Sequence, residues 1–226
     1  METQALNPSF LQNGKFQLNI KIVLALLLQI IFVGIKIQNA TAAPLAIKNQ
    51  ARENLKLGNS QQAIDLLNRN SNLAGADSEY YFLKARAYQD LRRNTDALAN
   101  YSIAIYLNPK FVNAFINRGL VRGALQDVNG ALIDLDRALL LQPNNTAALL
   151  NRGVTYGGLN KPSLAIQDFN KAIQINPNYP DAYRNRGLTK HLLGDKDGAC
   201  DDWYKSKNLG INEATEWLTK YCMQQK

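Results

Sequence analysis

The sequence predicts an all-α fold, an α-solenoid of about five 34-residue helix–turn–helix repeats followed by a C-terminal capping helix. The tripeptide Asn-Arg-Gly recurs at one fixed interval, at 117–119, 151–153 and 185–187. Proline recurs at the same interval, and so do one column of alanine and one of leucine, each five deep. These columns are Pro109, Pro143 and Pro177; Ala63, Ala97, Ala131, Ala165 and Ala199; and Leu57, Leu91, Leu125, Leu159 and Leu193.

The first element, residues 1–42, is typical of a targeting segment. Lys15 and Lys21 precede an apolar run over residues 22–35, which is shorter than the roughly 20 residues needed to span a bilayer. The small-x-small sequence at 40–42 predicts cleavage after Ala42 by a signal peptidase. Alternatively, the run stays uncleaved as a membrane anchor. In either case we expect an exported location, in a periplasm, a lumen or the extracellular space, or on the outer face of a membrane.

The repeats occupy residues 43–212, in units of about 44–77, 78–111, 112–145, 146–179 and 180–212. Each unit contains two stretches with apolar residues at helical spacing. Small residues in both stretches allow the two helices to approach closely, and one larger residue per unit fills the gap beside them. Proline ends the unit because it cannot continue a helix. The larger residues are Tyr101, Leu135, Phe169 and Trp203.

This pattern resembles the tetratricopeptide repeat family over residues 44–212. The fourth unit matches best, and the first and fifth depart from the pattern, as end units of a solenoid do. The resemblance implies a protein–protein interaction scaffold whose first helices line a concave face. The family's signature positions in the fourth unit hold Leu149, Gly153, Tyr156, Ala165, Phe169, Ala172 and Pro177.

The last element, residues 213–226, is predicted to be a capping helix that buries Trp217, Leu218 and Tyr221. Cys222 lies on this helix, and Cys200 occupies an apolar column of the fifth unit. In an oxidising compartment the two cysteines can form a disulfide worth about 3 kcal/mol. The alternative is two separate buried thiols.

The charged columns suggest ion pairs inside the fold. Arg118, Arg152 and Arg186 recur at the repeat interval, and so do Asp134, Asp168 and Asp202 on the second helices. Where lysine replaces the arginine, at position 84, asparagine replaces the acid, at position 100. The two columns therefore change together, which favours bridges between packed helices over a ladder that grips an acidic peptide or nucleic acid.

A ladder of asparagines on the first helices predicts a binding site. A carboxamide both donates and accepts hydrogen bonds, so it can hold the backbone of a bound peptide. The resemblance implies that these residues and their neighbours line the groove. The alternative is that the asparagines cap or bridge neighbouring helices. The predicted peptide-binding residues are Asn117, Asn151, Asn185, Ile116, Leu120, Leu150, Val154, Gly157 and Arg184.

Composition argues against other classes of protein. One histidine and two cysteines among 226 residues cannot supply an ordinary zinc site, and no nucleophile–base motif or phosphate loop is present. We therefore expect no catalysis, metal or cofactor. The net charge of +8 is spread along the chain without a nucleic-acid motif.

The sequence thus predicts an exported scaffold that binds another protein or peptide and assists assembly of an envelope or membrane complex. Two alternatives remain. One is a self-associating structural solenoid, and the other is a binder of an acidic or nucleic-acid partner through the arginine ladder.

Overall fold

The structure is a computed structural model that describes residues 44–73, 75 and 77–222. The chain divides into two compact units, residues 1–49 and 50–226. In the first unit the described residues, 44–49, are helical. The expected signal segment, its apolar run 22–35 and its cleavage site at Ala42 lie outside the described residues.

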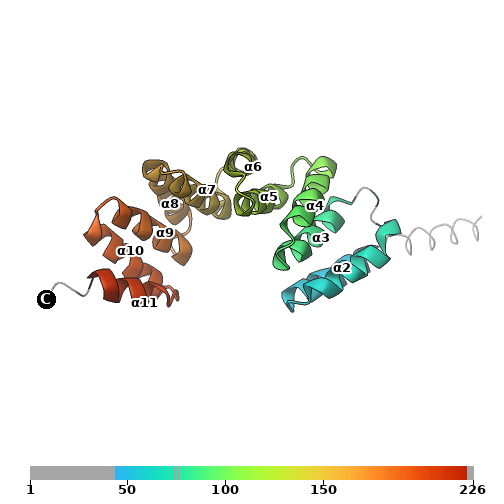
Figure 1. Cartoon of the computed structure of the whole chain (residues 1–226), viewed down its shortest axis with the longest axis horizontal. Coiled ribbons are helices and arrows are strands. Elements are labelled where there is room, and N and C mark those ends of the chain that lie inside the picture. Colours follow the sequence, from blue (N-terminus) through green and yellow to red (C-terminus); the bar gives the residue numbers. More distant parts are fainter. Residues whose placement is uncertain (1–43, 74, 76, 223–226) are drawn as a thin grey trace, which may run out of the picture. The chain divides into compact units, whose positions relative to one another are not determined.

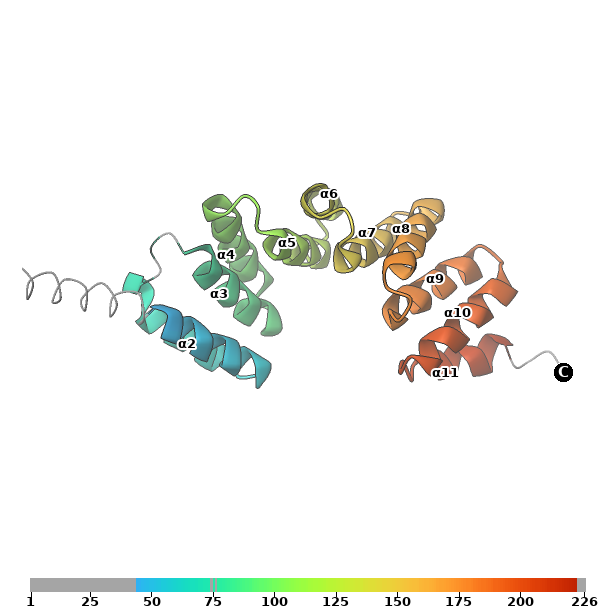
Figure 2. The same ribbon diagram turned by 180° about the vertical axis from the view of Figure 1, so that it is seen from behind.

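The second unit is an array of helices that follow one another in chain order (Figure 1), and the view from behind shows the same succession (Figure 2). It begins with helical residues 50–56 and contains no β-strand in its described part. The helices are α2 Ser60–Arg69, α3 Ser78–Asp90, α4 Asn94–Leu107, α5 Val112–Ala124, α6 Val128–Leu141, α7 Thr146–Gly158, α8 Pro162–Ile175, α9 Pro180–Leu192 and α10 Lys196–Asn208, with a short 3-10 turn, η2 Ser71–Leu73, before α3.

These helices form the predicted pairs. The pairs α3–α4, α5–α6, α7–α8 and α9–α10 make the most extensive contacts, and each second helix also packs on the first helix of the next pair. First helices touch one another too, α3 with α5, α5 with α7 and α7 with α9. The predicted all-α solenoid is therefore confirmed, and α5, α7 and α9 present one continuous face.

Close packing inside each pair depends on a small residue in the first helix. A Cβ added to Gly153 would lie 2.6 Å from the Phe169 ring, and one added to Gly187 would lie 2.7 Å from the Trp203 ring. Phe169 and Trp203 are buried, so neither ring has room to move away. The larger side chains fill the gap beside the small ones, as the sequence predicts.

The turn inside each repeat contains a left-handed residue. Its backbone φ is positive at five positions that share one column of the repeat, although two of the five are long side chains. A residue in this conformation after a helix satisfies the last carbonyl groups and reverses the chain. The five residues are Gly58, Arg92, Gln126, Asn160 and Gly194.

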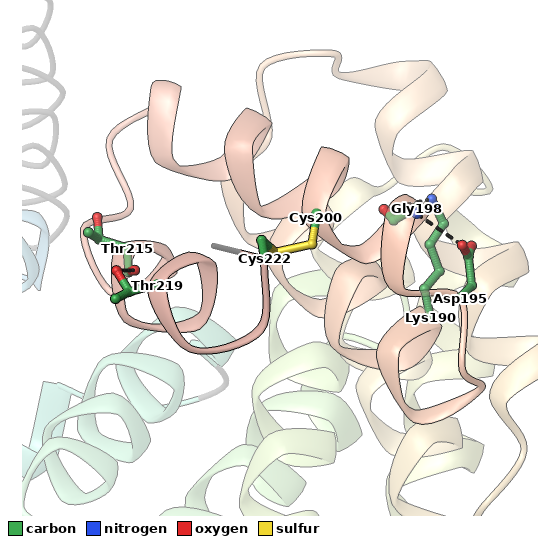
Figure 3. Close-up of a disulfide and its surroundings, with 7 residues drawn as sticks. All are labelled: Lys190, Asp195, Gly198, Cys200, Thr215, Thr219 and Cys222. Atoms are coloured by element: carbon green, nitrogen blue, oxygen red, sulfur yellow. Dashed lines mark hydrogen bonds between the residues drawn. A yellow bond between two sulfur atoms is a disulfide. The ribbon is translucent and has the colours of Figure 1, made fainter. Parts of the chain in front are cut away.

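The C-terminal cap packs against α10. It consists of the short helix α11 Ala214–Trp217 and a π-helical turn, η3 Leu218–Cys222, where the sequence predicts one helix. Leu218 is buried against Trp203, and the Tyr221 ring packs against the His191 ring at a tilt, with 4.4 Å between the ring centroids. A disulfide joins Cys222 to Cys200 of α10 (Figure 3). Residues 223–226 of the predicted cap lie outside the described residues.

None of the helices within residues 44–73, 75 and 77–222 has both the length and the apolar content needed to cross a bilayer.

Candidate functional site

The arginine ladder is neutralised inside the fold. Arg118 donates to both carboxylate oxygens of Asp134, at 2.9 and 2.7 Å, so the pair is bidentate. Arg152 makes the same pair with Asp168, and Arg186 makes it with Asp202. These are the three pairs that the sequence predicts, and each joins the first helix of a repeat to its second helix.

Each of the three arginines also reaches back to the preceding repeat. The Nη1 atoms of Arg118, Arg152 and Arg186 donate to acceptors at 3.1, 2.7 and 2.6 Å. The acceptors form a column of their own on the second helices, namely Ser102, Asp136 and Asn170. Every arginine therefore ties three helices together. This third contact was not predicted from the sequence, although its residues recur at the repeat interval.

The electrostatics of the ladder agree with a structural role. The hydrogen bonds that Arg152 donates to Asp168 and that Arg186 donates to Asp202 raise the pKa of the two guanidinium groups, against the opposing effect of burial. Lys84 stands in the same column but has Asn100 in place of an aspartate, and burial lowers the pKa of its ammonium group. The positive charges of Arg118, Arg152 and Arg186 are therefore neutralised by Asp134, Asp168 and Asp202, which favours a structural role over ligand binding.

The continuous face of α5, α7 and α9 has a different character. Three apolar side chains are partly exposed on it, Leu120 at 39%, Val154 at 48% and Leu188 at 39% of their surface. They occupy equivalent positions of successive repeats, and we call them the apolar column. Beside it lie the amide column, Asn117, Asn151 and Asn185, and the glycine column, Gly123 and Gly157. Together the three columns define the groove.

Two clefts open within the groove. The first, of about 330 Å³, lies between α5 and α7 and is lined by Gly123, Leu120, Asn151, Val154 and Thr155, among others. The second, of about 200 Å³, lies between α7 and α9 and is lined by the equivalent residues of the next repeat. Uncharged side chains line both clefts. The second cleft has Gly157, Val154, Asn185, Leu188 and Thr189 at the matching positions.

The glycine column explains why the clefts exist. A Cβ added to Gly123 or Gly157 would meet nothing within 4 Å. One repeat earlier the same position holds Gln89, whose amide oxygen accepts a 2.6 Å hydrogen bond from the Tyr101 hydroxyl. One repeat later it holds His191, whose ring packs against the Trp203 and Tyr221 rings, which also contact each other. Side chains thus fill the position in the second and fifth repeats and leave it open in the third and fourth.

The amide column is only partly engaged. The Asn117 carboxamide lies beside the Tyr101 hydroxyl, and Asn185 donates to the Asp181 carbonyl at 2.8 Å. The Asn151 carboxamide has no hydrogen-bond partner among the described residues, and it borders the first cleft. Amides facing an apolar cleft can bind a polar backbone that passes over them.

Comparison with known proteins gives the family. Three family models described as tetratricopeptide repeat match residues 82–146, 146–179 and 169–201. The chain belongs to the tetratricopeptide repeat family. A comparison with curated protein sequences found no match.

Solved structures of tetratricopeptide repeat proteins share the fold. PilF of Pseudomonas aeruginosa superposes with a TM-score of 0.69 at 18% identity, over 80% of this chain and 87% of that one. MamA of Desulfovibrio magneticus RS-1 gives 0.65 at 19% identity, over 74% and 94% of the two chains. YrrB, described as a tetratricopeptide repeat protein with an unusual peptide-binding site, gives 0.61 at 19% identity, over 77% and 90%.

This tetratricopeptide repeat fold indicates a protein–protein interaction scaffold, and such proteins are generally not enzymes. Within the described residues, no group of three or more His, Cys, Asp or Glu side chains is placed to hold a metal ion.

The structure brings most of the predicted groove residues together. Leu120, Val154 and Gly157 line the clefts with Asn151 and Asn185. Asn117 lies on the same face of α5, one repeat before Asn151.

Two predicted residues do not lie in the open groove, and a third has a partner. Ile116 is only 6% exposed and belongs to the central core, so its assignment as a peptide-binding residue is corrected. Leu150, its counterpart in the next repeat, is half-buried against the same core. Ile116 and Leu150 pack into this core because the first helices of successive repeats, α5 and α7, contact each other. Arg184 lies on α9 and forms a 3.1 Å ion pair with Asp181.

Several cleft residues were not predicted from the sequence. The Thr155 and Thr189 hydroxyls donate hydrogen bonds to the backbone carbonyls of Asn151 and Asn185. Leu188 is the third member of the apolar column. Gln126 and Val128 also line the first cleft, and Asn160 and Pro162 line the second at the equivalent positions. These residues recur at the repeat interval, so the sequence contains a signal that relates them to one another. That signal identifies them as groove residues only when the faces of α5, α7 and α9 that line the groove are known.

Proposed function

We propose that this chain is an exported scaffold that binds an extended segment of another polypeptide in the groove of α5, α7 and α9. The observation that carries the proposal is the pair of equivalent apolar clefts, one repeat apart, each bordered by an asparagine. Two sites of one kind at a fixed interval suit a linear ligand, which can place one side chain in each.

The mechanism divides recognition between backbone and side chains. The amide column binds the backbone of the ligand, because a carboxamide can donate to a carbonyl and accept from an N–H group. The clefts accept apolar side chains, whose burial supplies the favourable free energy. Asn151 supports this division, since its carboxamide borders a cleft and has no partner among the described residues.

Two observations support export. The Lys15–Ala42 segment has the charge, apolar run and cleavage pattern of a secretory signal. Cys200 and Cys222 are joined in a disulfide, a bond that persists in oxidising compartments and is rare in the cytosol. We propose that the chain works in an exported, oxidising compartment, where it assists assembly of an envelope or membrane complex. It is either released by cleavage of the signal or held to the outer face of a membrane by residues 22–35.

Peptide binding is tested by selection from a displayed library of random peptides against the full chain. A triple variant, Asn117→Ala, Asn151→Ala and Asn185→Ala, is compared with a control in which three exposed second-helix asparagines, Asn68, Asn129 and Asn208, become Ala. We expect selected peptides to bind the wild type and the control alike and to lose at least tenfold in affinity for the groove variant. Equal binding to all three, with equal helix content by circular dichroism, would place recognition on another face.

Export is tested by mass spectrometry and N-terminal sequencing of the chain recovered from fractionated cells. A chain in the exported fraction that begins at Ala43 supports cleavage, and a full-length chain in the membrane fraction supports the anchor. Recovery of an uncleaved chain from the cytosol contradicts export.

A further inference from the structure

We propose that the occupant of the groove is a polyproline-II segment with apolar side chains three residues apart and an acidic side chain one turn beyond them. This inference rests on the proposed function and adds the conformation, spacing and charge of the ligand. The conformation and spacing follow from the interval between the clefts and from the amide column. The acidic residue follows from Arg86, which lies at the α3 end of the apolar column.

The interval between the clefts selects the conformation. The clefts are lined by equivalent residues and separated by one step between touching first helices, α5 to α7 to α9. Packed helices lie about 8–10 Å apart, so the clefts repeat at about that distance. A polyproline-II chain advances about 9 Å in its three-residue turn. A β-strand returns a side chain to one face after about 6.6 or 13 Å, which fits neither value.

An α-helix would meet the interval with apolar residues seven apart, about 10.5 Å along its axis. Its backbone groups, however, already bond one another, so they would leave the amide column unused. A polyproline-II chain has no internal hydrogen bonds. Its carbonyl and amide groups are therefore available to Asn117, Asn151 and Asn185, which recur at the same interval as the clefts.

The number of clefts limits the motif to two apolar side chains. Gln89 and Tyr101 close the equivalent position before α5, and His191 closes it after α7 with the Trp203 and Tyr221 rings. The ligand therefore places two apolar residues, at i and i+3, between these closed ends. The residues between them are uncharged, because no side chain that lines either cleft could compensate a charge.

Charge complementarity supplies the third feature. Arg86 stands one repeat before Leu120, at the α3 end of the apolar column, and it is exposed. It forms no ion pair with any described residue, in contrast to Arg184, which pairs with Asp181 at the α9 end. An acidic residue three positions from the first apolar one would meet the Arg86 guanidinium with a charge-assisted bond.

Synthetic peptides test the spacing with the full chain. The lead peptide contains Asp-Pro-Ser-Leu-Pro-Ser-Leu, and a second carries the same motif in reverse order. Comparison peptides place the two leucines two, four or seven residues apart, the last in an alanine-rich helical background. We expect one of the two i,i+3 peptides to bind at least tenfold more tightly than every comparison peptide, by calorimetry or fluorescence anisotropy.

Variants of the chain test the clefts and the cation. Gly123→Gln and Gly157→Gln place in each cleft the side chain that the second repeat already holds as Gln89, and Ala99→Gln on the exposed side of α4 is the control. We expect each cleft variant to weaken the lead peptide at least fivefold and the control to leave it unchanged. Arg86→Gln should abolish the preference for Asp over Asn in the peptide, while Arg184→Gln should keep it.

The outcomes separate this inference from the function beneath it. If library peptides bind and the cleft variants weaken them, but the helical or another spacing binds best, the polyproline-II inference is wrong and the groove remains the site. If Arg86→Gln leaves the Asp preference intact, the acidic position is wrong. If no peptide binds the full chain at all, the proposed function fails together with the inference.

Discussion

The buried carboxylate of Asp134 offers the sharpest test of the arginine ladder. Its side chain is fully buried and accepts hydrogen bonds from two arginines, Arg118 at 2.9 and 2.7 Å and Arg122 at 2.9 Å. The substitution Asp134→Asn keeps the size of the side chain and removes its charge. It leaves two largely buried guanidinium groups facing a neutral amide.

The expected loss follows from burial. Removing one partner of a buried ion pair costs about 3–5 kcal/mol, because the remaining charge stays desolvated without compensation. Asp136 is the matched control, since its side chain is 54% exposed and accepts one bond from Arg152 at 2.7 Å. An exposed pair contributes only about 0.2–1 kcal/mol, so Asp136→Asn should cost no more than that.

Urea unfolding measured by far-UV circular dichroism gives the loss of unfolding free energy for Asp134→Asn and for Asp136→Asn. We expect the Asp134→Asn midpoint to fall steeply, with the slope of the unfolding free energy against urea checked for each variant, because repeat arrays can lose cooperativity. A loss below about 1 kcal/mol for Asp134→Asn, or equal losses for the two variants, would refute the view that the ladder stabilises the packing of the repeats.

Three further substitutions address the turn, the cap and a buried tyrosine. Gln126→Gly should raise the unfolding free energy by about 1 kcal/mol, because φ is +64° there and only glycine adopts that angle without strain; an unchanged urea midpoint would show no strain. Cys200→Ser should lower it by about 3 kcal/mol by opening a loop of 22 residues, and reduction of the wild type should give the same loss. Burial raises the pKa of Tyr101, so the unfolded chain ionises near pH 10 while the folded chain stays protonated, and stability present below pH 10 is lost above it. Tyr101→Phe should therefore show a flatter fall of stability above pH 10 than the wild type in alkaline titrations of unfolding.

Much of the fold could be predicted because one signal repeats. Residues such as Ala165 and Phe169 recur with their counterparts at the repeat interval, and the contacts between the two helices of a pair are made by residues that recur in this way. The left-handed residues at Arg92 and Gln126 were predictable in principle, since Gly58 and Gly194 share their column. A single sequence shows this only when the whole column is read, because neither side chain favours that conformation by itself.

The groove was predicted less completely because it depends on contacts between repeats. Ile116 was expected in the groove, but the step between α5 and its neighbouring first helices buries it. That step is set by how one repeat packs on the next, and helical periodicity does not determine it. The reach of Arg152 to Asp136 in the preceding repeat was missed for the same reason.

Two glycines of α7, at neighbouring turns of the helix, differ in what they do, and the same substitution separates them. Gly153 lies against the second helix, where an added Cβ would be 2.6 Å from the buried Phe169 ring. Gly157 faces the cleft, where an added Cβ would meet nothing within 4 Å. Gly153→Ala should therefore lower the unfolding free energy by about 1–3 kcal/mol through overpacking.

Gly157→Ala should have the opposite sign. Alanine favours a helix over glycine by up to about 1 kcal/mol, and the cleft has room for the methyl group. Urea midpoints of the two variants should thus move in opposite directions. If both fell, Gly157 would have a packing role and the cleft would not be open space. A stabilising Gly157→Ala means that the native chain forgoes stability at the floor of the groove, which favours retention of that glycine for a ligand rather than for the fold.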